Sequence, residues 1–480
     1  MPTLRATFRI QFRPDFDLSA AADVADYLAA LGVSHLYASP YLQAAPGSTH
    51  GYDVVDPTRV SRDLGGEAGH QRLTRSLDRA GLGQVLDIVP NHMSVAEGNA
   101  WWWDVLRNGP ASRHANVFDV DWDPPEAKLR NQVLMPILGD HYGRELEAGH
   151  LRLERVGAEF VLRYHDRAIP VGTASLPPLL ERAATLLMEP PDPPADGRTL
   201  QFPGPATAPP TSGDGEDPAS PDMTRAEELA FLARSLRRLP DAGAEDAGLR
   251  EARRRDLDVV EGRLRDLTAR PAVVRALDRA VRELNEDVEA LDDLVSVQNY
   301  RLAYWRTAGQ ELDYRRFFDI DNLAAIRTED PRVFEAVHDL PLRWVREGVL
   351  DGLRVDHPDG LRLPAEYFRR LREAAPGAWI VVEKILMPDE ALRPWPVDGT
   401  TGYDFLNMVT GLFLEPSSGD AFTALWRTVS GDDRPFHDVA LEARDQVLRD
   451  VLAADLNRLA NVFVQVCEAR RRYRDFTRSD

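Results

Sequence analysis

The sequence predicts an α/β fold, a (β/α)8 barrel of the TIM type that is incomplete in this chain and carries a large, mainly helical insertion after its third strand. Three observations lead to this prediction. Buried-strand patterns alternate with helical patterns near the N-terminus, the alternation stops after residue 92, and it resumes near residue 300 with strands that end in charged residues. Strands and helices that alternate with short connections form a parallel sheet with right-handed crossovers. Polar groups at the carboxyl ends of barrel strands usually form the functional site.

Residues 1–92 are predicted to form the first part of the barrel. Strand patterns cover residues 6–12, 33–37 and 85–89, and the helical pattern between the first two ends at Gly32. Glycine often ends a helix because it adopts the left-handed conformation without strain. No glycine-rich fingerprint follows the first strand, so a dinucleotide-binding fold is disfavoured.

Residues 93–299 are predicted to form an inserted subdomain. Within it, residues 190–221 hold ten of the chain's 35 prolines, and a segment this polar and proline-rich predicts an exposed, mobile loop. Residues 224–298 have apolar residues three and four positions apart, which indicates long amphipathic helices. We expect a helical hairpin that packs on its own chain, and the alternative is a coiled coil with a partner.

The barrel pattern is predicted to resume over residues 300–480. Strand patterns at 352–355 and 378–382 each follow a helical pattern, and residues 401–405 form a weaker, sixth strand pattern. Residues 436–480 are predicted to be mostly helical. Neither a seventh and eighth strand nor a C-terminal β domain is recognisable, so we expect the last strands and that domain to be absent from this chain.

Composition narrows the class of protein. Asp and Glu number 78 against 58 Lys and Arg, for a net charge of −20, which argues against nucleic acid and anionic membranes as partners. The single cysteine, Cys467, excludes an intrachain disulfide and argues against a thiolate metal site. We find neither an N-terminal leader signature nor an apolar run of about 18 residues, so we expect a cytoplasmic protein without a membrane span.

Charged residues follow the predicted strands of the barrel. Asp87 lies in the third strand, Arg354 and Asp356 end the fourth, and Glu383 ends the fifth. Neighbouring parallel strands are about 4.8 Å apart, and retaining glycosidases hold a nucleophile and an acid about 5–5.5 Å apart. The pattern therefore predicts glycosidic-bond chemistry, with the pKa of Asp356 lowered by Arg354. A structural Arg354–Asp356 ion pair, or a solvated Glu383 at the barrel rim, would each be an ordinary alternative.

No metal and no cofactor is expected. Asp87, His92, His357 and Asp359 have ligand chemistry, but no His-x-x-x-His spacing or comparable pattern supports a metal site. Tyr52 lies in the loop after the second strand, where it either stacks on a sugar ring or is an ordinary loop tyrosine.

Several segments resemble the α-amylase superfamily. Its first three conserved segments are matched by residues 87–92 (Asp-Ile-Val-Pro-Asn-His), 352–357 (Gly-Leu-Arg-Val-Asp-His) and 381–384 (Val-Val-Glu-Lys). A narrower resemblance, to the maltooligosyltrehalose synthase family of intramolecular glucosylmutases, rests on residues 36–40, 47–56, 138–143, 300–306, 314–318 and 399–405.

The resemblance implies a role for each matched residue. Asp356 would be the nucleophile, Glu383 the general acid/base, and Arg354 the residue that orients the nucleophile. Tyr52 would stack on the attacked sugar ring, and His92 would hydrogen-bond its hydroxyls. The remaining substrate-binding positions in or near the matched segments are His50, Asp87, His357, Lys384, Tyr403 and Asp404.

The resemblance also implies a reaction. The family converts the reducing-end α-1,4 bond of a maltooligosaccharide into an α,α-1,1 bond by a retaining double displacement, and its partner is a maltooligosyltrehalose trehalohydrolase. An α-amylase-family hydrolase or glucanotransferase, or an inactive glucan-binding fragment, is the alternative. The superfamily's fourth conserved segment, with a third acid, has no candidate before Asp480, so we expect a chain truncated at its C-terminus.

Overall fold

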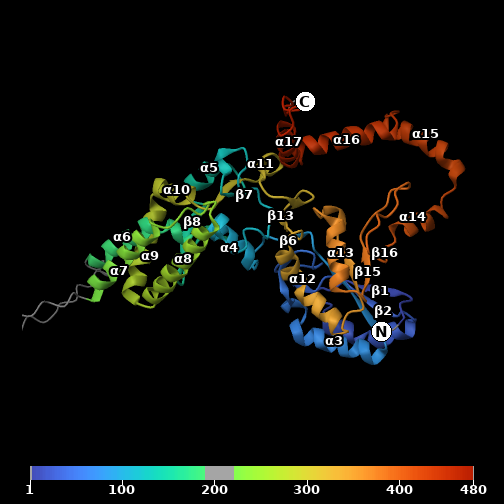
Figure 1. Cartoon of the computed structure of the whole chain (residues 1–480), viewed down its shortest axis with the longest axis horizontal. Helices are drawn as coiled ribbons and strands as arrows, with labels where there is room; N and C mark the ends of the chain where they lie inside the picture. The colour runs from blue at the N-terminus through green and yellow to red at the C-terminus, as the bar shows by residue number, and fades with distance from the viewer. Residues whose placement is uncertain (1–2, 190–220, 479–480) are drawn as a thin grey trace, which may run out of the picture. The chain divides into compact units, whose positions relative to one another are not determined.

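The structure is a computed structural model that describes residues 3–189 and 221–478 (Figure 1). Residues 190–220 lie outside the described residues, so the proline-rich loop stays a prediction. The chain divides into two compact units. The first comprises residues 1–102, 114–124 and 304–480, and the second comprises residues 103–113 and 125–303.

A parallel, six-stranded sheet forms the body of the first unit. Its order is β1-β2-β5-β14-β15-β16, so each strand lies beside the next parallel strand of the chain. A barrel keeps this order, whereas a doubly wound sheet reverses it at a switch point. Among the described residues β1 and β16 do not pair with each other, and the prediction of an incomplete barrel is confirmed. The strands are β1 (Thr7–Ile10), β2 (His35–Ala38), β5 (Gly83–Ile88), β14 (Gly352–Val355), β15 (Trp379–Val382) and β16 (Gly399–Thr400).

Helices between these strands pack on the sheet through their apolar faces (Figure 1). Leu86 of β5 and Leu353 of β14 are fully buried, in one core cluster with Leu73 and Phe368 from two of the helices. This burial makes the sheet a rigid platform for the side chains at its carboxyl edge. The helices are α1 (Leu18–Asp23), α2 (Ala25–Leu31), α3 (Gly66–Ala80), α12 (Pro331–Arg346) and α13 (Pro364–Ala374).

Two small antiparallel sheets accompany the parallel one in the first unit. The order of the larger is β12-β13-β6, and the smaller is the pair β3-β4. None of these five strands was predicted, because each is short or lies in a segment that reads as a loop. They are β3 (Leu42–Ala44), β4 (Val54–Val60), β6 (His92–Ser94), β12 (Arg316–Phe317) and β13 (Ile320–Ala325).

The sixth strand was predicted in the wrong place. The sequence pattern placed it at residues 401–405, but β16 ends at Thr400 and α14 begins at Tyr403. Gly402 separates the two with a φ of 92°, a left-handed conformation that turns the chain out of the strand. The helical prediction for residues 436–480 is confirmed by α16 (Phe436–Asp450) and α17 (Ala453–Glu468). Two further helices, α14 (Tyr403–Gly411) and α15 (Gly419–Ser430), were not predicted.

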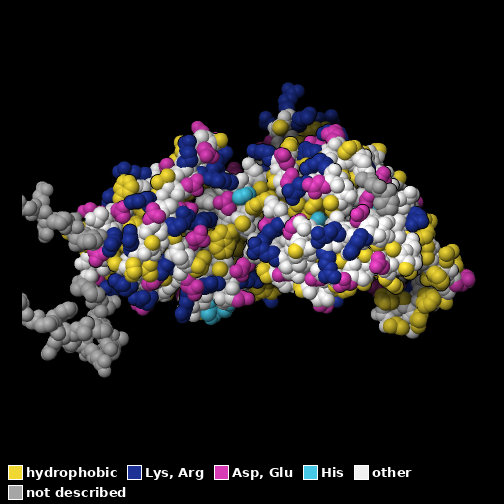
Figure 2. Space-filling view, turned by 90° about the horizontal axis from the view of Figure 1, so that it is seen from below, with side chains coloured by type: hydrophobic (Ala, Val, Ile, Leu, Met, Phe, Trp, Pro, Cys, Tyr) yellow, Lys and Arg dark blue, Asp and Glu magenta, His cyan; other side chains and the backbone are white. Residues whose placement is uncertain are grey.

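Helices α14, α15 and α16 bury none of their side chains. Large hydrophobic residues on them face solvent, among them Phe405 at 65% and Trp426 at 63% exposure. Figure 2 shows such hydrophobic side chains gathered at the surface. None of the described helices is long and apolar enough to cross a membrane.

The second unit combines helices with strands. A three-stranded antiparallel sheet has the order β10-β9-β8, and β7 pairs with β11. The predicted helices over residues 224–298 are present, and Leu257 and Leu277 on them are buried within the chain itself. The sequence predicts a mainly helical insertion and does not predict strands β7 to β11. The elements are α4 (Ala100–Asn108), β7 (Val133–Leu138), α5 (Tyr142–Glu147), β8 (Leu151–Val156), β9 (Glu159–Tyr164), β10 (Arg167–Pro170), α6 (Pro177–Met188), α7 (Pro221–Leu236), α8 (Ala247–Thr268), α9 (Pro271–Glu286), α10 (Val288–Ser296) and β11 (Tyr300–Tyr304).

Candidate active site

Arg354 lies at the centre of three carboxylates in the first unit. Its Nη1 donates to Asp87 Oδ1 and to Asp356 Oδ1, both at 2.7 Å. Its Nη2 lies 3.0 Å from Glu383 Oε1. One planar guanidinium thus holds the acid from each of three neighbouring strands, a geometry that a lysine cannot reproduce.

The strand register brings these groups together. β14 lies between β5 and β15, and Arg354 is paired opposite Asp87. The hydrogen-bond ladder continues past the strand ends, because the amide of Asp356 donates to Ile88 O at 2.9 Å and the amide of Glu383 donates to Val355 O at 3.0 Å. Both acids therefore occupy the carboxyl edge of the sheet.

The protonation of Asp356 differs from the expectation. Burial raises the pKa of Asp356 to about 7, and the Asp87 and Glu383 carboxylates act in the same direction. Arg354 lowers this pKa but does not outweigh those effects. The expected low pKa is therefore wrong, since one arginine faces three acids.

Asp87 is buried beneath the two other acids, where it accepts hydrogen bonds from two tyrosines. Its side chain is fully buried, and Oδ2 accepts hydrogen bonds from Tyr52 Oη at 2.6 Å and Tyr37 Oη at 3.1 Å. Burial raises the pKa of Asp87, which the Arg354 charge opposes. Tyr52 is fixed in turn by a hydrogen bond from Arg9 Nη2 at 3.1 Å.

Gly51 shapes the loop that carries Tyr52. Its φ is +80°, and a Cβ atom here would lie 2.2 Å from the carbonyl oxygen of Pro40. Any side chain would push the loop away from the sheet. This glycine therefore lets the Tyr52 hydroxyl reach Asp87.

His92 is a buried residue in the lining of the pocket. The residue is buried, and its Nε2 has no hydrogen-bond partner among the described residues. Burial lowers the pKa of His92 to about 3, so the ring is neutral. A buried polar atom without a partner is costly, and a ligand hydroxyl would satisfy it.

His357 follows Asp356 in a strained conformation. Its φ of 45° and ψ of 57° are left-handed, which is uncommon outside glycine. This conformation directs its amide toward Glu383, and the N–H donates to Oε2 at 3.1 Å. The second oxygen of Glu383 is thus held as firmly as the first.

A cavity of about 870 Å³ opens over these residues. This size is typical of small-molecule sites. Six of the predicted site residues line it, namely His50, Tyr52, His92, Asp356, His357 and Glu383. The lining residues that were not predicted as site residues are Asp53, Phe317, Phe318, Ile320, Asn322, Leu323, Asp359 and Ile385.

Five predicted site residues do not line this cavity. Asp87 and Arg354 lie beneath its floor, bound to Asp356 and Tyr52. The amine of Lys384 pairs with Asp359 and Glu390, both at 3.0 Å. Tyr403 and Asp404 begin α14, and Asp404 accepts a hydrogen bond from Thr400 Oγ1 at 2.9 Å.

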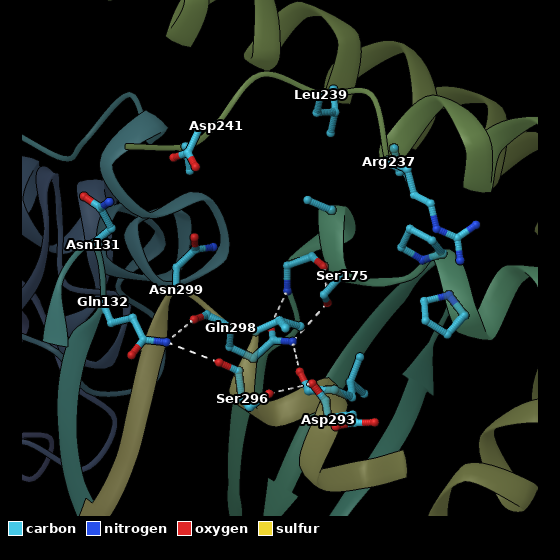
Figure 3. Close-up of a pocket in the computed structure, with 18 of the residues that line it drawn as sticks. Asn131, Gln132, Ser175, Arg237, Leu239, Asp241, Asp293, Ser296, Gln298 and Asn299 are labelled. Carbon is cyan, nitrogen blue, oxygen red and sulfur yellow. Dashed lines mark hydrogen bonds between the residues drawn. The ribbon is translucent and has the colours of Figure 1, made fainter. Parts of the chain in front are cut away.

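A second cavity, of about 810 Å³, lies in the second unit (Figure 3). Its amide side chains are engaged with the chain itself. Gln298 Nε2 donates to Ser175 Oγ at 3.0 Å and to Leu294 O at 2.6 Å, and Gln132 Nε2 donates to Gln298 O at 2.8 Å. The three acids that Arg354 holds all belong to the first unit, so we place the chemistry there.

The fold and the site define the class. A parallel sheet in barrel order, with an Asp, an Arg-x-Asp and a Glu at successive strands, is the arrangement that the resemblance to the α-amylase superfamily implies. In agreement, residues 15–143 match the family described as alpha amylase, catalytic domain.

Comparison with individual proteins narrows the class. The chain is 34% identical over 463 residues to a Mycobacterium tuberculosis protein named as a maltooligosyl trehalose synthase, a match covering 95% of this chain and 44% of that protein. The solved maltooligosyltrehalose synthase from Arthrobacter ramosus is 31% identical, with a TM-score of 0.67 over 97% of this chain and 46% of that one. A solved glycosyltrehalose synthase, from strain DSM5389, has a TM-score of 0.66 and 28% identity.

These matches confirm the resemblance to the maltooligosyltrehalose synthase family over nearly the whole of this chain. The chain itself spans about half the length of the relatives it matches, 44% for the Mycobacterium tuberculosis protein.

Proposed function

We propose that this chain carries the nucleophile and the acid/base of an intramolecular glucosylmutase. The reaction converts the reducing-end α-1,4 bond of a maltooligosaccharide into an α,α-1,1 bond, and the enzyme is an isomerase. The observation that carries the proposal is the binding of Asp356 and Glu383 to one guanidinium, that of Arg354. The similarity to the synthases supports this choice of reaction within the superfamily.

In the first step, Asp356 attacks the anomeric carbon that bears the reducing-end glucose. A bond forms from this carbon to the Asp356 oxygen, and the bond to the glucose O4 breaks. Glu383 gives its proton to that oxygen. The products are a glycosyl ester on Asp356 and a free glucose in the pocket.

In the second step, the glucose turns and attacks through its own anomeric hydroxyl. Glu383, now ionised, takes the proton of that hydroxyl, and Asp356 leaves as a carboxylate. Two inversions leave the α configuration unchanged. The product keeps the mass of the substrate but has no reducing end.

Retention of the glucose requires a pocket that holds sugar and limits water. Phe317 and Phe318 line the cavity, and the Phe317 ring lies 4.3 Å from the His92 ring. We assign sugar stacking to these two rings and to Tyr52. The unpaired His92 Nε2 is suited to a sugar hydroxyl.

A maltohexaose assay tests this function. Reducing ends and free glucose are followed together, and Asp356→Asn is the matched control because it keeps the shape of the side chain. Loss of reducing ends without glucose supports the mutase. New reducing ends would show a hydrolase instead. Binding of maltohexaose without either change would show an inactive glucan-binding chain.

Further expectations belong to the same proposal. Residues 93–299 would be an inserted subdomain of the barrel. The α,α-1,1 product would then be the substrate of a second enzyme, a hydrolase of the kind named malto-oligosyltrehalose trehalohydrolase in Rhizobium sp.. The acidic composition and single cysteine support a cytoplasmic location.

A further inference from the structure

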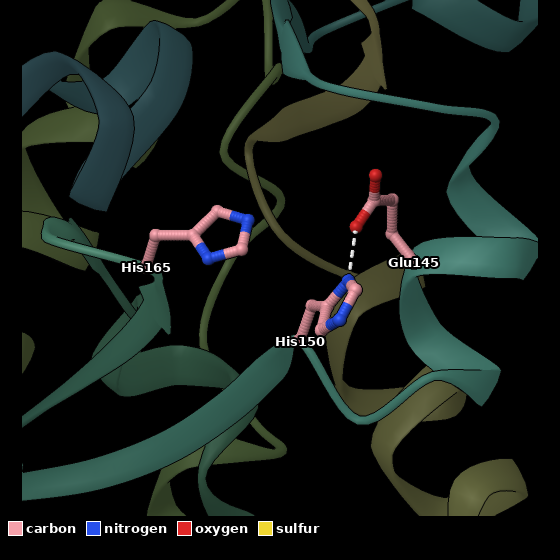
Figure 4. Close-up of side chains that lie close together, drawn as sticks. All are labelled: Glu145, His150 and His165. Atoms are coloured by element: carbon pink, nitrogen blue, oxygen red, sulfur yellow. Dashed lines mark hydrogen bonds and ion pairs between the residues drawn. The ribbon is translucent and has the colours of Figure 1, made fainter.

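A Glu-His-His cluster lies in the second unit, apart from the residues used above. Its members are Glu145 at the end of α5, His150 just before β8, and His165 in the turn between β9 and β10 (Figure 4). One ligand atom from each lies within 4.8 Å of the others. Figure 4 shows the Glu145 carboxylate directed at His150, with the His165 ring on the other side of His150.

The sheet register creates this cluster. β8 and β9 are antiparallel, with Leu151 paired opposite Tyr164. The next position outward therefore sets His150 opposite His165, and their rings are 5.3 Å apart. His165 has a φ of 52°, the left-handed conformation of a tight hairpin turn. The pair is invisible to local spacing rules, because fifteen positions separate the two histidines in the sequence.

The carboxylate is already oriented. Glu145 is buried, and its Oε2 lies 2.7 Å from His150 Nδ1. The Tyr164 hydroxyl hydrogen-bonds the same carboxylate and accepts a bond from the amide of Gly139 at 2.7 Å. Support of a ligand by an outer hydrogen bond of this kind is typical of metal sites.

The two histidines are exposed to solvent, and the arginines near them interact with other groups. The His150 side chain is 48% exposed, so an ion can reach it. Two arginines line the same surface hollow, but both are turned to other partners: Arg163 Nε pairs with Glu154 at 2.8 Å, and Arg152 Nε donates to Gly149 O at 3.2 Å.

We propose that Glu145, His150 and His165 bind a divalent transition-metal ion, with zinc as the expected occupant. Two imidazoles and one carboxylate are a common three-ligand set for zinc, with water as the fourth ligand. Ligand atoms of a tetrahedral zinc site with bonds of about 2.0–2.1 Å are about 3.4 Å apart. The Glu145–His150 pair has to open slightly and His165 has to approach, which its exposed turn allows. This site was not expected from the sequence, and the ion would tie α5 to the β8-β9-β10 sheet.

Zinc binding by the full chain, without an affinity tag, tests the proposal. Competition with a chromogenic zinc chelator is expected to reveal one equivalent of tightly bound zinc. His150→Ala and His165→Ala are each expected to abolish that equivalent. His437→Ala is the matched control, because His437 is 83% exposed and lies 3.4 Å from the carboxylate of Asp438. This control is expected to bind zinc as the unchanged chain does.

A second measurement uses the unchanged chain, so a folding defect in a variant cannot obscure the result. Zinc is expected to slow the acylation of His150 and His165 by diethyl pyrocarbonate, mapped by peptide mass spectrometry, and to leave His437 unaffected. Absence of stoichiometric binding, binding that survives both alanine substitutions, or equal protection of His437 would each overturn the proposal.

Discussion

The substitution Asp356→Asn is expected to stabilise the chain at alkaline pH while it removes the nucleophile. Burial and two neighbouring acids raise the pKa of Asp356 to about 7 in the folded chain. An aspartate in an unfolded chain has a pKa of about 3.9. The folded chain therefore binds one more proton than the unfolded chain between about pH 4 and pH 7.

The sign and the size of the change in the free energy of unfolding follow from this difference in bound protons. Stability falls as pH rises wherever the folded state holds the additional proton. A difference of about three in pKa corresponds to about 4 kcal/mol, since one unit equals about 1.4 kcal/mol. Shared titration with the neighbouring Asp87 reduces the part that belongs to Asp356, so about 2–4 kcal/mol is expected over the whole range from about pH 4 to pH 7. Asparagine lacks the charge, and its oxygen still accepts from Arg354.

Urea unfolding followed by tryptophan fluorescence measures this effect. The free energy of unfolding is compared for wild type and Asp356→Asn at pH 5 and at pH 8. The advantage of the variant should be larger at pH 8 by about 1–2.5 kcal/mol, because only the part of the proton-binding window that lies above pH 5 contributes to this comparison. Asp389→Asn, at an exposed position, controls for the loss of a surface charge. An advantage that is equal at the two pH values would refute the reasoning about Asp356.

Two further predictions concern neighbouring groups. Arg354→Leu leaves the buried Asp87 and Asp356 and the partly exposed Glu383 without their cation. The free energy of unfolding should therefore fall by about 3–5 kcal/mol, and by more at pH 8 than at pH 5, in the same urea experiment. Arg346→Leu, at an exposed arginine, is the control. Burial lowers the pKa of His338 to about 4, so the unfolded chain takes up a proton on this histidine at a higher pH than the folded chain does. His338 should therefore lower the free energy of unfolding by about 3 kcal/mol as pH falls from 6.5 to 4, and His338→Gln should remove this loss of stability. A difference in the free energy of unfolding between wild type and His338→Gln that stays constant over this pH range would contradict the second prediction.

The fold was predictable where strands are buried and bounded by clear breaks. β14 lies at residues 352–355 as predicted, because a glycine and a charged residue mark its ends. β16 was misplaced because Gly402 turns the chain where an alternating pattern suggested a strand. Strands β7 to β10 lie ahead of the long helices whose periodicity led to the prediction of a mainly helical insertion, and they were missed.

From the strand pattern of the sequence, only those site residues could be predicted that lie at the carboxyl ends of predicted strands. The grouping of Asp87, Arg354, Asp356 and Glu383 follows from parallel strands with polar carboxyl ends. The raised pKa of Asp356 depends on how many acids one arginine faces, which no strand pattern reports. Phe317 and Phe318 line the pocket from a hairpin distant in sequence, so local spacing gave no signal for them.

The glycosyl ester on Asp356 is the claim on which the account depends. A maltosyl fluoride with a second fluorine on its sugar ring keeps a good leaving group but slows breakdown of the ester, so the intermediate accumulates. After incubation with the full chain and tryptic digestion, the account predicts a sugar adduct on Asp356 in the peptide that spans residues 355–362, and no adduct with Asp356→Asn. An adduct on Glu383 or Asp87, or no adduct while the reagent is consumed, would contradict it.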